Sequence, residues 1–271
     1  MLQYFKYHYT EMIFLEKKFT PRGAGLALIL SLVFFALYFI FQVLSVYLIS
    51  LFVSSELLEQ MSLQLSIIGN CLSVLAFALI YRLASLSFTE GAHLNKIPTR
   101  FYINSVIMGV ATAFAVALIL GLISISGVLP DSWVTTQNNA YSDVSTASPL
   151  LKLLSVVLTG PLLEEVLFRG LILGTLKENM PPWVAIFLSA FIFGIAHGTP
   201  IGIIYATGLG ILMGWLFVRF NSVLPPLVFH MAYNCTVAYS EEISLPIAIF
   251  AIPIIVFEII DINRYFRGKQ K

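Results

Sequence analysis

Long apolar stretches separated by short polar segments dominate the chain from residue 24 onward. Eight of them approach the roughly 20 residues that a helix needs to cross about 30 Å of hydrocarbon. They lie at about 24–53, 63–81, 101–128, 149–176, 182–197, 202–217, 224–239 and 245–260. The pattern therefore predicts an all-α, polytopic membrane protein with about eight transmembrane helices.

Polar composition marks the segments around these predicted helices. Residues 1–23 mix basic, acidic and aromatic side chains, which predicts a cytoplasmic, interfacial segment. The region at 24–148 is predicted to hold three helices and, at 130–148, an outer loop rich in Ser, Thr, Asn and Asp. We expect four helices at 149–240 to form the core of the bundle, and 241–271 to hold the last helix and a basic tail.

The distribution of Lys and Arg predicts the orientation. Thirteen of the 15 lie in the two termini or in every second loop, as expected for cytoplasmic segments. Lys152 and Arg169 stand outside this pattern. Both termini are therefore predicted to be cytoplasmic, and the even number of helices agrees. We expect a multi-pass protein of the cell membrane, and the short loops and Lys-rich termini favour a bacterial plasma membrane.

Composition excludes several other classes of protein. With 59% hydrophobic and 11% charged residues, the chain differs from soluble domains, in which about 25% of residues are charged. A net charge of +1 provides no basic field for nucleic acid, so we expect no nucleic-acid partner. Cys71 and Cys235 match no metal or disulfide spacing, and we expect both to be small core residues.

The stretch 161–170, PLLEEVLFRG, places three charges inside an apolar helix. Charges at that depth are costly and usually have partners and a function. Glu165 and Arg169 are i and i+4, so they are predicted to pair along one helix face. Glu164 is rotated by roughly 100° and can point elsewhere. Pro161 removes a helix hydrogen bond, which predicts a kink with room for water or an extended substrate.

Two histidines and an asparagine lie in later apolar helices. Glu164 and His197 are each about 13 to 15 residues from the cytoplasmic ends of their helices, so we expect them at a similar depth of roughly 20 Å. His230 and Asn234, at i and i+4, share one face of the seventh helix. The alternative interpretation is that these histidines only pack or cap helices.

These residue types support two kinds of peptide hydrolysis. In the first, Glu164 and His197 activate water, and His230 and Asn234 stabilise the developing oxyanion. Glu165 and Arg169 then form a supporting structural pair, and no cofactor is required. In the second, Glu164, His197 and His230 hold a divalent metal, most simply zinc. The HExxH signature is absent, and the residues by themselves do not separate the two mechanisms.

A stripe of small residues follows the sixth predicted helix. It consists of Gly202, Ala206, Gly210 and Gly214, which recur every four residues. Small residues allow helix backbones to approach closely within a membrane. We therefore expect this helix to be buried against its neighbours.

Three motifs together resemble those of the CAAX protease and bacteriocin-processing family of intramembrane proteases, also called type II CAAX prenyl endopeptidases. The motifs are Glu164-Glu165-x-x-x-Arg169, Phe193-x-x-x-His197 and His230-x-x-x-Asn234. Their order and their placement in successive helices make the set specific, and together they cover roughly residues 150–239. The three preceding helices carry no matching motif.

The resemblance implies an intramembrane endopeptidase that acts on a peptide or protein substrate in or at the bilayer. It implies that Glu164 and His197 activate water, that His230 and Asn234 form the oxyanion site, and that Glu165, Arg169 and Phe193 support them. Because the family is often described as metal-dependent, the zinc alternative stays open.

We expect a bacterial member that cleaves small membrane-associated peptides or protein C-termini, in bacteriocin self-immunity or peptide maturation. One alternative is a catalytically silent immunity or scaffold protein that binds a toxin or a sensor kinase. Another is a transporter, although the chain shows no convincing internal repeat of the kind that many carriers have. The sequence leaves the oligomeric state open.

Overall fold

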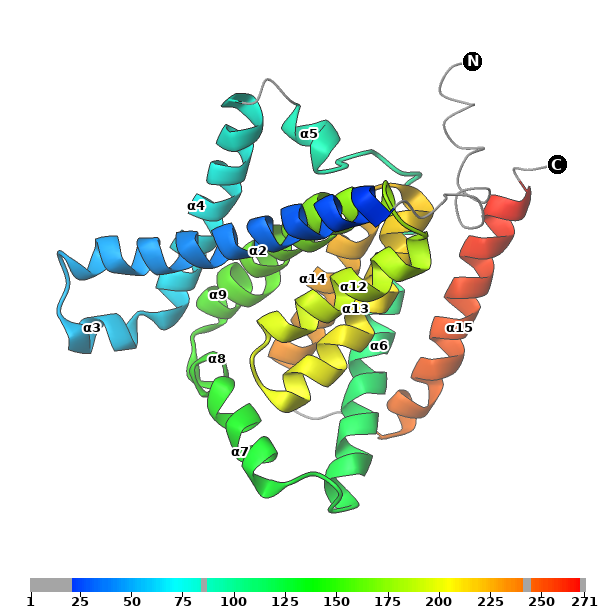
Figure 1. The fold of residues 1–271 in the computed structure, drawn as a ribbon. Helices are drawn as coiled ribbons and strands as arrows, with labels where there is room; N and C mark the ends of the chain where they lie inside the picture. The colour runs from blue at the N-terminus through cyan, green and yellow to red at the C-terminus, as the bar shows by residue number, and fades with distance from the viewer. Residues whose placement is uncertain (1–20, 84–86, 241–244, 269–271) are drawn as a thin grey trace.

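The computed structural model describes residues 21–83, 87–240 and 245–268, and within these ranges it is helical without strands (Figure 1). The predicted all-α fold is therefore confirmed. The interfacial segment expected at 1–23 lies almost entirely outside the described residues.

Each of the eight predicted apolar stretches is helical. The elements are α2 (Pro21–Ser50), α4 (Ser62–Leu83), α6 (Arg100–Ile125), α9 (Pro149–Lys152), η1 (Leu153–Thr159), α10 (Gly160–Glu164), η2 (Glu165–Leu173), α11 (Gly174–Lys177), α12 (Pro182–Ala196), α13 (Pro200–Phe220), α14 (Leu224–Tyr239) and α15 (Leu245–Gly268). Four helices of the described part, α2, α4, α6 and α13, are each long and apolar enough to cross a membrane. The apolar helix α12 is shorter, at 15 residues. The protein is a multi-pass membrane protein.

Short helices occupy several connections. They are α3 (Ser55–Gln60), α5 (Phe88–Gly91), α7 (Asp131–Ala140) and α8 (Ser142–Thr146). The last two fill most of 130–148, so the polar connection expected there contains two short helices. Asp131 in the first turn of α7 stabilises its N-terminus, where the helix dipole is positive. The hydroxyl of Thr136 donates to the carbonyl of Ser132 one turn earlier, so polar side chains remain compatible with this helix.

The segment from α9 to α11 lies at the centre of the bundle. It contacts α2 and α4 on one side and α12, α13 and α14 on the others. Beyond α14 lies α6, and α15 packs on α6 at the edge of the molecule (Figure 1). The charged stretch predicted from the sequence is therefore surrounded by the other helices.

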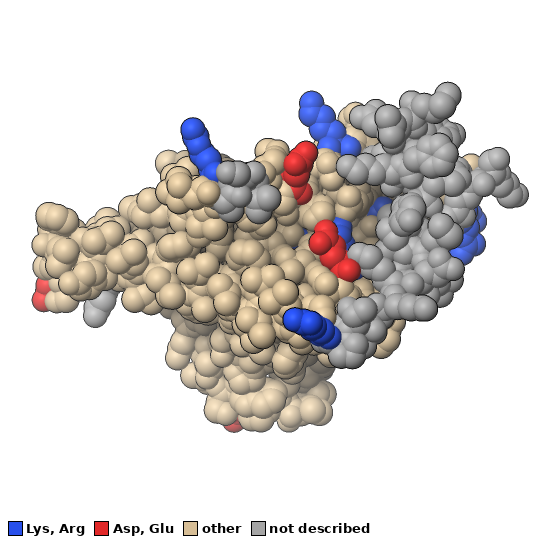
Figure 2. All heavy atoms as spheres, turned by 45° about the horizontal axis from the view of Figure 1, so that its top comes forward, with Lys and Arg blue, Asp and Glu red and all other residues tan. Residues whose placement is uncertain are grey.

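The outer surface is apolar over a wide area, as a bilayer requires. Large hydrophobic side chains such as Val43 and Leu75 are about two-thirds exposed, at 67% and 65%. Figure 2 shows a broad uncharged surface, with most of the charged side chains visible in that view gathered toward one end. Cys71 and Cys235 are also exposed, so the prediction that they are core residues was wrong. In a membrane protein an apolar neighbourhood does not indicate burial, because the lipid-facing surface is apolar too.

The small-residue stripe of α13 is buried, as predicted. Ala206 is fully buried, and a Cβ placed on Gly210 would lie 2.9 Å from both Cα and Cβ of Ala190 in α12. A Cβ on Gly194 of α12 would likewise overlap the side chain of Thr207. Close backbone approach between α12 and α13 therefore depends on glycine at these positions.

Candidate active site

The central segment changes its helical winding on both sides of α10. The N–H of Gly160 donates to the carbonyl of Ser155, and the N–H of Gly174 donates to that of Arg169, five residues back in each case. Such π-helical turns are frequent at functional sites. Pro161 has no N–H to offer, which suits a position where the α-helical pattern is interrupted. The predicted interruption at Pro161 thus takes the form of a change from π to α winding.

A buried ion pair lies directly after α10. Arg169 Nη1 donates to Glu165 Oε1 at 2.8 Å, as the i, i+4 spacing predicts, and the two side chains are 1% and 0% exposed. The guanidinium also lies 4.4 Å from the centre of the Phe193 ring. Ion pairing and the aromatic face together offset the cost of removing these charges from water.

His230 joins this pair from α14. Its Nδ1 lies 2.9 Å from Glu165 Oε1, the same oxygen that accepts from Arg169. The second carboxylate oxygen of Glu165, Oε2, is buried without a hydrogen-bond partner among the described residues. Glu165 therefore connects the guanidinium to the imidazole inside the protein. The sequence predicted its pairing with Arg169 but not its contact with His230.

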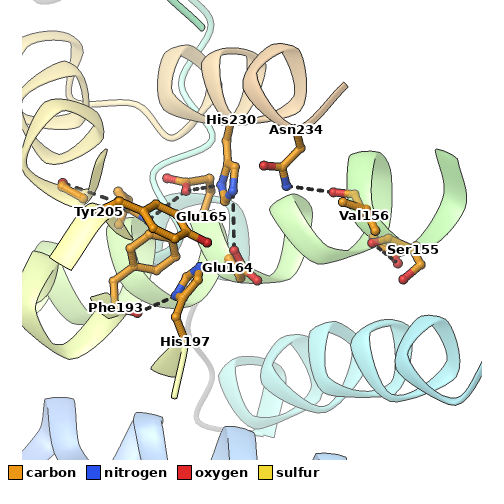
Figure 3. A network of polar contacts seen from close by, with 12 residues as sticks. Ser155, Val156, Glu164, Glu165, Phe193, His197, Tyr205, His230 and Asn234 are labelled. Atoms are coloured by element: carbon orange, nitrogen blue, oxygen red, sulfur yellow. Dashed lines mark hydrogen bonds and ion pairs between the residues drawn. The ribbon is translucent and has the colours of Figure 1, made fainter. Parts of the chain in front are cut away.

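Glu164 lies at the edge of this buried cluster. Its side chain is 29% exposed, and its Oε2 is 3.6 Å from His230 Nε2. Figure 3 shows Glu164 between His230, which projects from α14, and His197, which follows the end of α12. One histidine thus faces both carboxylates, Glu165 through Nδ1 and Glu164 through Nε2.

His197 is held by the helix that it terminates. Its Nδ1 lies 2.9 Å from the carbonyl oxygen of Phe193, and its ring packs edge-on against the Phe193 ring at 4.7 Å. His230 contacts the same phenylalanine ring at 5.9 Å. Phe193 therefore contacts both imidazoles. Gly198, with a φ of +72°, lets the chain turn directly after His197.

Asn234 lies one turn after His230 on α14, as the spacing predicts. Its Nδ2 donates to the carbonyl oxygen of Val156 at 2.9 Å (Figure 3). Val156 belongs to η1, where π winding leaves carbonyl groups outside the regular α-helical pattern. One amide hydrogen of Asn234 is thus engaged by the protein, which fixes the side chain and leaves a second hydrogen to donate.

Comparison with known proteins finds similarity over this part of the chain. Residues 146–236 match the family model described as "Type II CAAX prenyl endopeptidase Rce1-like". A curated relative from Bacillus subtilis (strain 168), named "Putative membrane peptidase YdiL", is 34% identical over 102 residues. That match covers 38% of this chain and 41% of the relative. No solved structure matches.

Residues 146–236 of this chain are thus similar to Rce1-like type II CAAX prenyl endopeptidases. All three motifs that suggested the family lie within the matched residues, from Glu164 to Asn234. The resemblance that the motifs suggested is therefore confirmed over these residues. The chain spans about two-fifths of the length of the curated relative.

The metal site considered from the sequence needs Glu164, His197 and His230 around one ion. In the ranges that the structure describes, no group of three or more His, Cys, Asp or Glu residues is placed to hold a metal ion. Glu164 and His230 lie together, and His197 directs Nδ1 to a backbone carbonyl, which leaves its Nε2 open. The zinc alternative therefore stays a prediction from the sequence.

Two tyrosines near the candidate site were missed by the sequence analysis. Tyr205 of α13 packs its ring against His197 at a centroid distance of 6.0 Å, and its hydroxyl bonds to that of Tyr141. Burial is the main cause that raises the pKa of Tyr141, and the negative charge of Glu164 raises it further. No spacing in the sequence connects these residues, since their contacts cross between elements that are far apart along the chain.

Proposed function

We propose that this Rce1-like protein is an intramembrane endopeptidase in which Glu164 and His197 activate the attacking water. The observation that carries the proposal is the contrast between two adjacent carboxylates. Glu165 is fully buried and bound to Arg169 and His230, whereas Glu164 is 29% exposed beside the same histidine. A carboxylate that is fixed at the edge of a desolvated cluster, yet open on one side, suits a general base.

The hydrogen bond of His197 supports its role as a second base. A backbone carbonyl can only accept, so Nδ1 carries the hydrogen that is directed to Phe193. In the neutral ring Nε2 then holds the lone pair. His197 can therefore accept a proton through Nε2 while its ring stays anchored.

The surroundings of His230 support a role in stabilising negative charge. Its Nδ1 faces the Glu165 carboxylate, so Nε2 becomes a donor when the ring is protonated. With His230 protonated, the cluster of two carboxylates, one guanidinium and one imidazolium is electrically neutral. Such a balance makes a buried charge tolerable. His230 Nε2 and the second amide hydrogen of Asn234 would then donate to the oxyanion that forms on the substrate carbonyl.

The catalytic sequence needs no group beyond these side chains and water. Glu164 or His197 takes a proton from water, and the resulting hydroxide attacks the peptide carbonyl carbon. The tetrahedral oxyanion is held by His230 and Asn234, and the proton then passes to the leaving nitrogen as the carbon–nitrogen bond breaks. Equal activity after chelation and a metal-free elemental analysis would support this mechanism over the zinc alternative.

We propose small membrane-associated peptides or protein C-termini as substrates, with a role in bacteriocin self-immunity or peptide maturation. The site lies within a multi-pass bundle, so a substrate that is already in or at the bilayer meets it without crossing open solvent. The bacterial origin of the matched relative agrees with a bacterial plasma membrane.

Substitution of Glu164 by Gln tests the proposal. The purified protein in liposomes is incubated with a set of synthetic lipid-anchored peptides, and products are measured by mass spectrometry. We expect cleavage to fall by about 10²- to 10⁴-fold, because the general base is lost while shape is kept. Glu90→Gln, at an exposed position in α5, is the matched control and should cleave like the wild type.

Unchanged cleavage by Glu164→Gln would eliminate this mechanism. In cells, the same variant distinguishes the alternative of a non-catalytic immunity or scaffold protein, which would keep its protective effect without the carboxylate. Measurement of proton or solute flux in the same liposomes tests the transporter alternative.

A further inference from the structure

His197 ends its helix, so its ring depends on neighbouring side chains for its orientation. Its backbone N–H still bonds within α12, but the chain turns away at Gly198, and the ring is half-buried. Phe193 borders the ring on one side at an interplanar angle of 72°. Tyr205 borders it from α13 at 79°. Two edge-on aromatic contacts thus define the plane of the imidazole.

Tyr205 is itself tied to the polar segment that precedes the core. Its hydroxyl bonds to the hydroxyl of Tyr141, which lies between α7 and α8, 64 residues earlier in the chain. The neighbouring Gln137 accepts a hydrogen bond from the hydroxyl of Thr199, the residue that caps α13. Both ties connect the α7–α8 segment to the N-terminal part of α13.

The α7–α8 segment has little apolar burial of its own. None of its residues is fully buried, and Trp133 is 36% exposed. It contacts α13 through α7 and α4 through α8. Polar ties such as those of Tyr141 and Gln137 therefore contribute much of what holds the segment in place. Because the same ties hold Tyr205, the position of the segment and the orientation of the histidine ring are linked.

We propose that Tyr205 is a positioning residue for His197 and that Tyr141, through its hydroxyl, holds Tyr205 in place. This inference rests on the proposed function, because it gives the histidine a catalytic task. The ring of Tyr205 limits rotation of the imidazole, so that Nε2 stays directed toward the region of Glu164. Because the hydroxyls of Tyr141 and Tyr205 are bonded to each other, a displacement of the α7–α8 segment also displaces the Tyr205 ring.

Kinetics of substituted proteins tests the positioning role. In Tyr205→Leu we expect kcat to fall by up to about 10²-fold with little change in KM, since misplacement of a catalytic group affects the reaction rather than the binding. The pH profile of kcat should change as well, because the imidazole loses a fixed environment. Tyr205→Phe keeps the ring but loses the hydroxyl bond to Tyr141, so its kcat should lie between those of the wild type and Tyr205→Leu.

Hydrogen exchange tests the bond between Tyr205 and the α7–α8 segment without depending on activity. Tyr205→Phe and Tyr141→Phe each remove the hydroxyl pair, so both should raise amide exchange within 131–146 to the same extent. The double variant should add nothing further. Tyr239→Phe is the matched control, because it removes a tyrosine hydroxyl bond to the carbonyl of Pro149 elsewhere on the protein.

The outcomes separate this inference from the proposed function. If the wild type cleaves and Tyr205→Leu retains full kcat, the positioning role is overturned while the peptidase remains. If exchange in 131–146 responds no more to Tyr205→Phe than to Tyr239→Phe, the tie is overturned. If the wild type cleaves none of the peptides, the proposed function fails, and the catalytic role of Tyr205 fails with it.

Discussion

Removal of the buried guanidinium should destabilise this protein far more than removal of an exposed one. Arg169 is 1% exposed, its only close carboxylate partner among the described residues is the fully buried Glu165 at 2.8 Å, and it lies over the Phe193 ring. In Arg169→Met the carboxylate loses its strongest partner and stays buried. Breaking a buried ion pair in this way typically costs about 3 to 5 kcal/mol.

A double variant separates the lost charge from the lost packing. In Glu165→Gln/Arg169→Met neither charge remains in the interior, so the penalty of an uncompensated carboxylate disappears. We expect the double variant to be more stable than Arg169→Met by at least about 1 kcal/mol, which is within the range of couplings between contacting residues. The free energy of unfolding of Glu165→Gln alone should lie between those of the double variant and Arg169→Met. This single variant keeps an unpaired guanidinium, but it also retains a polar contact for His230.

Reversible unfolding in mixed detergent micelles gives these free energies. Arg100→Met is the control, since Arg100 is exposed and stacks on Phe101 at 4.4 Å and on Tyr265 at 4.3 Å. Its loss should cost about 1 kcal/mol or less, as expected for an exposed cation–π contact. If Arg169→Met is no more destabilised than Arg100→Met, or if the single effects simply add in the double variant, the electrostatic argument is refuted.

Two further predictions concern packing and pH. Gly210→Ala should destabilise the protein by about 1 to 3 kcal/mol, because the added Cβ would lie 2.9 Å from Ala190. Gly208→Ala on the same helix meets nothing within 4 Å and should stabilise the protein by roughly 0.5 to 1 kcal/mol. Equal effects of the two substitutions in the unfolding assay would contradict this. Partial burial raises the pKa of Tyr141 above its usual 10.0, so its contribution to stability is fully present below about pH 10 and is lost as the pH rises through the folded-state pKa. Ultraviolet difference titration of the wild type against Tyr141→Phe should therefore show a tyrosine that ionises late, and ionisation near pH 10 would contradict the prediction.

Much of the helical framework could be predicted from local patterns. The apolar stretches predicted α2, α4 and α6 to within a few residues at most ends, because a helix that crosses lipid must be apolar along its length. The pairing of Glu165 with Arg169 followed from their separation of four residues on one helix. The small residues of α13 likewise indicated a close helix contact. Each of these features is a property of a single segment.

Contacts between helices could not be predicted in the same way. The sequence placed Glu164 and His197 at a similar depth, but it did not predict the contact of Glu164 with His230. Depth along a helix can be counted, but the direction of a side chain depends on helix rotation. The π turns around α10 change that rotation.

The sequence by itself thus determined the helices, the membrane environment and the residue types available for chemistry. The tertiary structure decided that Glu165 binds His230 as well as Arg169, that Glu164 alone of the two carboxylates is partly open, and that Tyr205 reaches His197. It also decided the exposure of the cysteines. Segments that face lipid and segments that face the protein core are both apolar, so the sequence pattern does not distinguish them. The physical reason is that helix formation depends on neighbours along the chain, whereas a site built from several helices depends on how their side chains pack together.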